Sequence, residues 1–174
     1  MQDLKSKVRT IMDFPKPGIQ FRDITTLLAD PEGLKGTIDA LADRYQNTEI
    51  DAVAGIEARG FTIGAALAYR LNTGFLMIRK PGKLPGETIG IDYELEYGSD
   101  RVEIHVDSVA KNSRILMIDD LLATGGTMEA ACRLIEKAGG NVVECAFVID
   151  LPDLGGNQKL SRYPVFSLIN FEGE

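Results

Sequence analysis

The sequence predicts an α/β fold in which a mostly parallel, twisted sheet is flanked by helices. Two observations carry this prediction. Short apolar runs alternate with segments whose apolar residues recur at helical spacing, and several of these runs end in glycine-rich or charged loops. Runs that are apolar throughout are typical of parallel strands covered by helices on both faces. With 174 residues, the chain suits a single domain, residues 1–174.

The first half of the chain contains recognisable helix and strand signals. We expect a short amphipathic helix over residues 3–12. Asp30 and Pro31 are typical of a helix start, as N-cap and first-turn residues, and the apolar residues that follow keep helical spacing as far as Tyr45. Strands are expected over residues 50–56, 75–78 and 101–106, and a helix rich in small residues over 61–71.

The second half contains the most informative segment of the sequence. A buried strand over residues 115–118 runs directly into two adjacent carboxylates, Asp119 and Asp120. The loop that follows is Ala123-Thr124-Gly125-Gly126-Thr127, and an amphipathic helix then continues to the glycine pair at 139–140. A long strand over 142–149 and an apolar, strand-like stretch over 165–169 complete the expected fold.

The loop over residues 123–127 has the composition of an anion-binding site. Backbone N–H groups in a glycine-rich loop point at an anion, and the dipole of the following helix favours negative charge. Thr124 and Thr127 can add hydroxyl donors. Asp119 and Asp120 cannot bind a phosphate directly, but they suit the two hydroxyls of a ribose or a bridging cation. The alternative, a helix-capping pair followed by an ordinary turn, explains the parts separately and not their combination.

Charged residues follow two more of the expected strands. Glu57-Ala58-Arg59-Gly60 comes after the strand over 50–56, and Arg79-Lys80 comes after the strand over 75–78. The first of these loops has the glycine spacing of a nucleoside-triphosphate P-loop, but Phe61 occupies the position of the required lysine, which excludes that class. Because ligands of parallel sheets bind at the carboxyl ends of the strands, we expect all three strand ends to share one crevice.

Residues 80–98 are expected to form a flexible loop beside this crevice. Cations, prolines and glycines alternate there, and regular structure is expected to resume only near Arg101. In an acidic chain, cations grouped at a strand end favour an anion clamp, with Arg79 as the fixed contact and Lys83 moving in as the loop closes. A solvated basic loop is the alternative.

Composition and charge limit the function classes. The net charge is −7 and the isoelectric point about 4.8, which disfavours nucleic acid as a partner. No apolar run approaches membrane length, so no membrane partner is expected. Cys132 and Cys145 lack the spacing of metal ligands, and the one histidine, His105, fits an outward strand position. We therefore expect a cytoplasmic protein without a histidine-based catalytic centre.

The chain also resembles a known family. Residues 119–127 resemble the ribose-phosphate signature of the type I phosphoribosyltransferases, which use phosphoribosyl pyrophosphate (PRPP). The segments at 57–61 and 78–86 extend the resemblance along the chain, and those at 13–24 and 95–98 together narrow it to the adenine branch. The resemblance implies the type I phosphoribosyltransferase fold with a small N-terminal hood over residues 1–30. It also implies transfer of a phosphoribosyl group from PRPP to adenine, giving AMP and pyrophosphate, through an oxocarbenium-like transition state with Mg²⁺.

The same resemblance assigns roles to individual residues. The 5′-phosphate would be held by Ala123, Thr124, Gly125, Gly126 and Thr127, and the ribose hydroxyls by Asp119 and Asp120. The pyrophosphate would be surrounded by Glu57, Ala58, Arg59, Arg79 and Lys83, and the adenine by Ile19, Phe21, Arg22 and Leu121. Glu96 would manage the adenine N7 proton, although the sequence alone favours a surface position. The resemblance assigns no protein residue as a direct Mg²⁺ ligand, because PRPP would mainly hold the ion, with Asp119 and Asp120 nearby.

Two alternatives share the PRPP signature. A sister enzyme for hypoxanthine, guanine or xanthine would keep residues 119–127 and change the hood segment at 14–24. A PRPP-sensing regulator would carry an added DNA-binding domain, whereas only residues 1–49 precede the first expected core strand. The resemblance further implies a homodimer, in which the Arg59 and Arg79 regions approach the partner subunit, and a cis peptide bond between Glu57 and Ala58.

Overall fold

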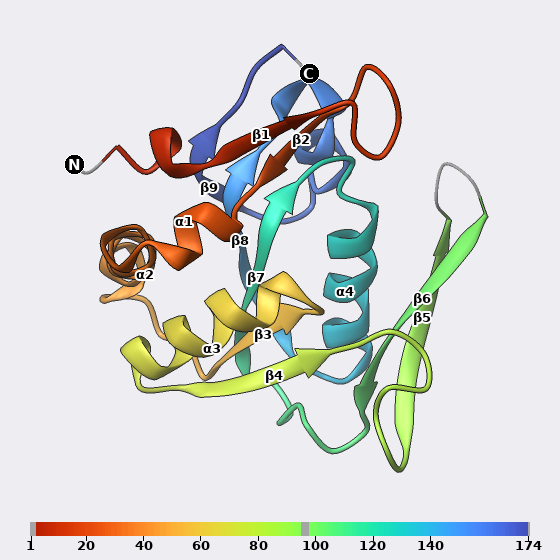
Figure 1. The fold of residues 1–174 in the computed structure, drawn as a ribbon. Helices are drawn as coiled ribbons and strands as arrows, with labels where there is room; N and C mark the ends of the chain where they lie inside the picture. Colours follow the sequence, from red (N-terminus) through yellow and green to blue (C-terminus); the bar gives the residue numbers. More distant parts are fainter. Residues whose placement is uncertain (1–2, 95–97, 174) are drawn as a thin grey trace.

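A five-stranded parallel sheet forms the centre of the computed structural model, which describes residues 3–94 and 98–173 (Figure 1). Its strand order is β4-β3-β7-β8-β9, and every neighbouring pair is parallel. The bounds are Ala52–Ile56 for β3, Gly74–Ile78 for β4, Arg114–Leu122 for β7, Asn141–Asp150 for β8 and Val165–Asn170 for β9. The predicted α/β architecture is therefore confirmed.

Helices cover both faces of this sheet. On one face lie the helices α1 (Thr25–Ala29), α2 (Pro31–Tyr45) and α3 (Arg59–Leu71), and on the other lies α4 (Gly126–Lys137) (Figure 1). Successive residues of a strand point to opposite faces, so β3 contributes Val53 to the core under α3 and Ala54 to the core under α4. This two-sided burial explains why β3 is apolar throughout and why the middle of β7 and most of β8 are apolar.

The predicted start of α2 is confirmed at atomic level. The Asp30 side chain accepts a hydrogen bond from the Glu32 amide at 3.2 Å, and Pro31 occupies the first turn. Helix α3 begins at Arg59, two residues before the predicted range. After β8 the chain forms two short helical turns, η2 (Pro152–Leu154) and α5 (Gly156–Lys159), before β9.

The predicted helix over residues 3–12 is wrong. The chain forms only a short 3-10 turn, η1 (Lys5–Lys7), followed by the strand β1 (Arg9–Met12). Strand β1 pairs antiparallel with β2 (Gln20–Asp23), because the chain reverses between them through two residues of positive φ, Asp13 and Gly18. The backbone hydrogen bonds of β1 are thus satisfied by a partner strand that helical spacing could not reveal.

The prediction that regular structure resumes only near Arg101 is also wrong. Residues 88–94 form the strand β5 (Thr88–Glu94), which pairs antiparallel with β6 (Ser99–His105). This hairpin packs on α4, and an antiparallel bridge between Glu103 of β6 and Arg79 joins it to the chain directly after β4 (Figure 1). Ile89, Ile91 and Tyr93 alternate along β5 and pack against the core under α4, which explains why the segment is ordered as a strand.

Candidate functional site

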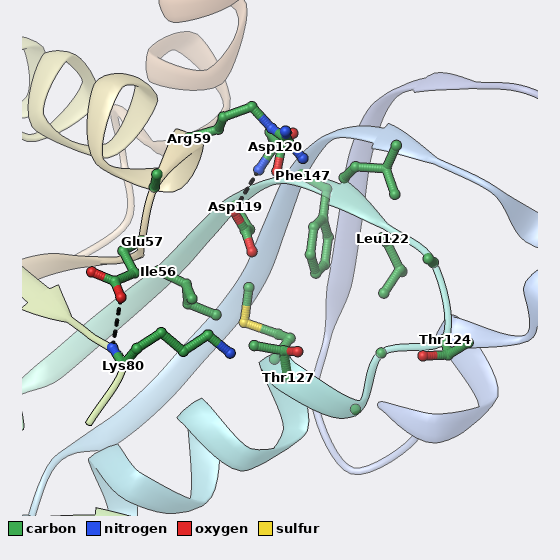
Figure 2. Close-up of a pocket in the computed structure, with 16 residues that line it drawn as sticks. Ile56, Glu57, Arg59, Lys80, Asp119, Asp120, Leu122, Thr124, Thr127 and Phe147 are labelled. Carbon is green, nitrogen blue, oxygen red and sulfur yellow. Dashed lines mark hydrogen bonds and ion pairs between the residues drawn. The ribbon is translucent and has the colours of Figure 1, made fainter. Parts of the chain in front are cut away.

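A cavity of about 350 Å³ opens at the carboxyl ends of β3 and β7 (Figure 2). Its lining consists of Ile56, Glu57, Ala58, Arg59, Lys80, Phe147 and the continuous stretch from Asp119 to Met128. These residues come from the ends of β3, β4 and β7, with Phe147 from β8. The predicted meeting of the three strand ends in one crevice is confirmed.

The glycine-rich loop at residues 123–127 forms one end of this cavity. Gly125 has a φ of 80°, a left-handed conformation that favours glycine, and α4 begins at the next residue. The loop therefore delivers the N-terminus of a twelve-residue helix to the cavity wall. Thr124 and Thr127 both line the cavity, and Thr127 Oγ1 donates a hydrogen bond to the Tyr93 hydroxyl at 3.2 Å (Figure 2).

The turn at Gly155–Gly156 supports the loop from behind. A methyl group on Gly156 would overlap the Ala123 carbonyl oxygen, and a methyl group on Gly125 would lie 2.9 Å from the Gly156 carbonyl oxygen. Asn157 anchors the turn by donating a hydrogen bond from Nδ2 to Asp150 Oδ2 at 2.8 Å. The position of the loop thus depends on close backbone contact with residues that the sequence analysis did not single out.

The two adjacent carboxylates have different environments. Asp120 is buried, and its Oδ2 accepts a hydrogen bond from Arg59 Nε. Asp119 points its carboxylate into the cavity, and its Oδ1 accepts the Asp120 amide at 2.9 Å (Figure 2). Burial, together with the nearby Asp120 charge, raises the pKa of Asp119 well above its ordinary value. Asp119 is therefore the carboxylate available to a ligand, while Asp120 fixes Arg59.

Glu57 holds the start of the loop after β4. Its Oε2 accepts a hydrogen bond from Arg79 Nε at 2.7 Å, and its Oε1 accepts one from the Lys80 amide at 2.8 Å. Burial alone would raise the pKa of Glu57, but these hydrogen bonds outweigh it and lower that pKa. The peptide bond between Glu57 and Ala58 is cis, as the family resemblance implied.

Arg79 and Lys83 take positions outside the described lining of the cavity. Arg79 is directed at Glu57, and its Nη1 also donates to the Lys83 carbonyl oxygen at 3.1 Å. The two predicted clamp residues are thus linked to each other through the loop backbone.

Lys80 lines the cavity, where the predicted convergence of the strand ends placed it, although no ligand contact was assigned to it. Its ammonium contacts Asp100 of β6 and donates to the Tyr93 hydroxyl at 3.0 Å. Side chains of neighbouring residues in extended backbone point to opposite sides, so the Lys80 side chain points away from the side on which Arg79 contacts Glu57. This alternation could have predicted that Lys80, and not Arg79, faces the cavity.

The four residues predicted to contact the base are only partly brought together. Leu121 lines the cavity. The centroid of the Phe21 ring lies 5.7 Å from the guanidinium of Arg59, which also lines the cavity. Ile19 is exposed. Arg22 stacks its guanidinium 4.3 Å from the ring centroid of Phe171 and donates to Thr10. Glu96 lies outside the described residues.

The carboxylates at the cavity suit a hard cation such as Mg²⁺, which prefers oxygen ligands. Within residues 3–94 and 98–173, no group of three or more histidine, cysteine, aspartate or glutamate residues could hold a metal ion by itself. The pair at 119–120 supplies carboxylate oxygens at the cavity, which fits an ion held mainly by a bound phosphate ligand.

Within residues 3–94 and 98–173, no helix is long and apolar enough to cross a membrane.

Known proteins resemble this chain over nearly its full length. Residues 23–173 match the phosphoribosyl transferase domain family. An adenine phosphoribosyltransferase of Nitrosomonas europaea is 60% identical over 171 residues, covering 97% of this chain and 98% of that protein.

Two solved structures share the fold. The adenine phosphoribosyltransferase of Thermoanaerobacter pseudethanolicus has a TM-score of 0.94 and 48% identity, with 98% of this chain and 99% of that chain covered. The enzyme of the same name from Saccharomyces cerevisiae, complexed with adenine and an imino-altritol bisphosphate, has a TM-score of 0.91 and 40% identity. That match covers 96% of this chain and 97% of the yeast chain.

Proposed function

This chain belongs to the adenine phosphoribosyltransferase family, and we infer from that premise that it transfers the 5-phosphoribosyl group of PRPP to adenine, giving AMP and pyrophosphate. In this chain, the main support is the cavity at the ends of β3 and β7, which is lined by an anion-binding loop, a carboxylate and cations. The relatives described above bear the adenine name, which favours this base over the oxopurines and an enzyme over a sensor.

The proposal places the 5′-phosphate of PRPP against the loop at residues 123–127. The helix terminus at Gly126 and the hydroxyls of Thr124 and Thr127 support this placement. Asp119 would accept hydrogen bonds from the ribose hydroxyls, since its carboxylate faces the cavity. Asp120 would assist from its ion pair with Arg59.

The pyrophosphate would lie on the opposite side of the cavity, near the Glu57–Ala58 peptide. Arg59 supplies positive charge there, and Arg79 would join it, held in orientation by Glu57. Glu57 is itself an anion, so it would act through Arg79 and the Lys80 amide. Lys83 would approach as the loop between β4 and β5 closes over the site, excluding water that would otherwise hydrolyse the sugar.

The chemistry follows from charge. As pyrophosphate departs, positive charge builds on the ribose, so the cations stabilise the leaving group while Asp119 favours the developing cation. Mg²⁺, held mainly by PRPP near Asp119 and Asp120, would supply further neutralisation of the leaving group when bound.

The adenine would lie under the hood of residues 1–30, near Ile19, Phe21, Arg22 and Leu121, with Glu96 accepting its N7 proton. Residues 1–174 would act as one domain.

The test is nucleotide formation from PRPP with adenine, hypoxanthine and guanine offered separately, with Mg²⁺ and after its chelation. We expect AMP from adenine, little IMP or GMP, and loss of product on chelation that added Mg²⁺ restores. Product from the oxopurines would keep the PRPP site and contradict the hood assignment. A protein that binds PRPP and forms no product from any base would favour the sensor.

The proposal includes a homodimer. Strand β4 is an edge of the central sheet, and its Met77 is 47% exposed, while Tyr69 on the neighbouring helix α3 is 88% exposed. Exposed apolar side chains at a sheet edge are typical of an interface. Light scattering would measure the mass, and Met77→Glu should shift it towards the monomer.

A cytoplasmic location is part of the same proposal, supported by the buried, free thiols of Cys132 and Cys145.

A further inference from the structure

The Tyr93 hydroxyl lies at the meeting point of three elements around the cavity. Lys80, after β4, approaches it with Nζ at 3.0 Å. Thr127, in the first turn of α4, approaches it with Oγ1 at 3.2 Å, and Asp100 Oδ2 of β6 lies 3.1 Å away. Tyr93 is only 7% exposed, and these three groups are the hydrogen-bond partners of its hydroxyl within the described part of the chain.

The hydrogen-bonding capacity of this hydroxyl is fully used. A tyrosine hydroxyl has one proton to donate and two lone pairs to accept with. Lys80 can only donate, and Thr127 is oriented to donate, so the Tyr93 proton goes to Asp100. In this arrangement the single hydroxyl proton of Thr127 is directed at Tyr93 and not at the cavity.

A rotation of the Tyr93 hydroxyl changes what Thr127 can offer. If the Tyr93 proton turns from Asp100 to Thr127 Oγ1, Thr127 becomes the acceptor and its own proton is free for an anion in the loop. Asp100 stays satisfied, because it is also in direct contact with the Lys80 ammonium. The exchange requires only rotation of two hydroxyl protons, with no movement of heavy atoms.

Tyr93 also orients the cation of the cavity. An ammonium has three N–H groups. Asp100 and Tyr93 accept two of those of Lys80, and the side chain lines the cavity, so a third N–H remains for a ligand there. The same hydroxyl therefore touches both the phosphate-loop threonine and the cavity lysine.

We propose that Tyr93 is a positioning residue for the transfer reaction, whose hydroxyl sets the donors of Thr127 and Lys80 for the phosphate groups of the substrate. This inference rests on the proposed function. Tyr93 itself touches no substrate. It couples the β5–β6 hairpin to the phosphate loop, so that the hairpin's position and the loop's affinity for phosphate depend on each other.

The variant Tyr93→Phe tests the proposal, because it keeps the buried ring and removes only the hydroxyl. The variant loses the hydrogen bonds that the Tyr93 hydroxyl makes with Thr127 and with Lys80. We expect this loss to raise the KM for PRPP and the Kd for AMP by about three- to tenfold. We expect kcat to change by less than about twofold, since the lost contacts act on binding. Tyr163→Phe is the matched control: the Tyr163 hydroxyl donates to Glu136 at 3.1 Å, away from the cavity.

A double-mutant cycle with Thr127→Val separates positioning from a general structural effect. The AMP affinities of the two single variants and the double variant should be non-additive, because removal of either hydroxyl already breaks the same contact. Full additivity, or an unchanged AMP affinity in folded Tyr93→Phe, would overturn the proposal while leaving the proposed function intact. Failure of the unaltered protein to bind AMP at all would overturn both.

Discussion

Gly60, in the first turn of α3, lies directly against the carboxylate of Asp119. A methyl group on Gly60 would lie 2.9 Å from Asp119 Oδ1 and 3.1 Å from the Ile118 carbonyl oxygen. The same Oδ1 accepts the Asp120 amide, so Asp119 cannot move aside without losing that hydrogen bond. The absence of a side chain at position 60 therefore sets where the cavity-facing carboxylate lies.

Gly60→Ala should displace the Asp119 carboxylate and lower kcat/KM for PRPP by tenfold or more, roughly the effect of losing one well-placed contact in the transition state. The alanine itself is a better helix former than glycine, by about 1 kcal/mol, which offsets part of the strain. Steady-state kinetics and a thermal melt would measure the two effects. Gly74→Ala is the control, because a methyl group there would lie 3.9 Å from Ala52 Cβ, an ordinary contact distance. Equal activity of both variants would contradict the argument.

Glu96→Gln should slow turnover much more than it weakens PRPP binding. A carboxylate that accepts a proton in the transition state contributes on the order of 10²–10⁴ in rate, and the amide cannot accept that proton. Single-turnover AMP formation would measure the chemical step, and titration would measure PRPP affinity. Glu94→Gln, at the exposed end of β5, is the matched control. An unchanged single-turnover rate in Glu96→Gln would remove this residue from the mechanism.

Gly156→Ala should weaken phosphate binding without touching the ligand. The added methyl group would overlap the Ala123 carbonyl oxygen and press on the Leu122 side chain, which forces the loop at 123–127 to shift. Overpacking of this kind costs about 1–3 kcal/mol in stability. Calorimetric titration with AMP should show an affinity at least about tenfold lower, equivalent to roughly 1.4 kcal/mol. Full AMP affinity in a folded variant would show that the turn does not position the loop.

The central sheet was predictable because its strands carry their own signal. The strand β3 is apolar throughout, and β7 and β8 carry long apolar runs over residues 115–118 and 145–149, a pattern that favours a sheet covered on both faces. The N-terminal strand β1 was not predictable in the same way. Leu4, Val8 and Ile11 have helical spacing, and only the pairing with β2 decides between helix and strand.

Part of the site was predictable because ligands of parallel sheets bind at the carboxyl ends of the strands. This principle predicted from the sequence alone that Glu57, Arg59 and Asp119 line one cavity. The contacts of Tyr93 were not predictable, because they depend on the register of a hairpin that pairs Tyr93 with Asp100. The direction of Arg22 towards Phe171 likewise depends on tertiary packing that a linear motif does not encode.

Asp23 should make the stability of the protein depend on pH in the acid range. Its carboxylate accepts hydrogen bonds from Arg9 Nε at 3.1 Å and from the Thr25 amide at 3.0 Å. The hydrogen bond from Arg9 is the main cause that lowers the pKa of Asp23 from 3.8 to about 2. Because the folded pKa lies below the unfolded one, the stabilisation is complete above the unfolded value and is lost as the pH falls towards 2.

Asp23→Asn should therefore lower the free energy of unfolding by about 1 kcal/mol at pH 7, a value discounted for the solvent exposure of Arg9. The difference from the unaltered protein should be the same at pH 5 and shrink at pH 3, because the unfolded aspartate is largely protonated there. Urea unfolding at the three pH values measures it. A difference that stays constant down to pH 3 would show that the Asp23 contacts with β1 stabilise the hood through geometry and not through charge.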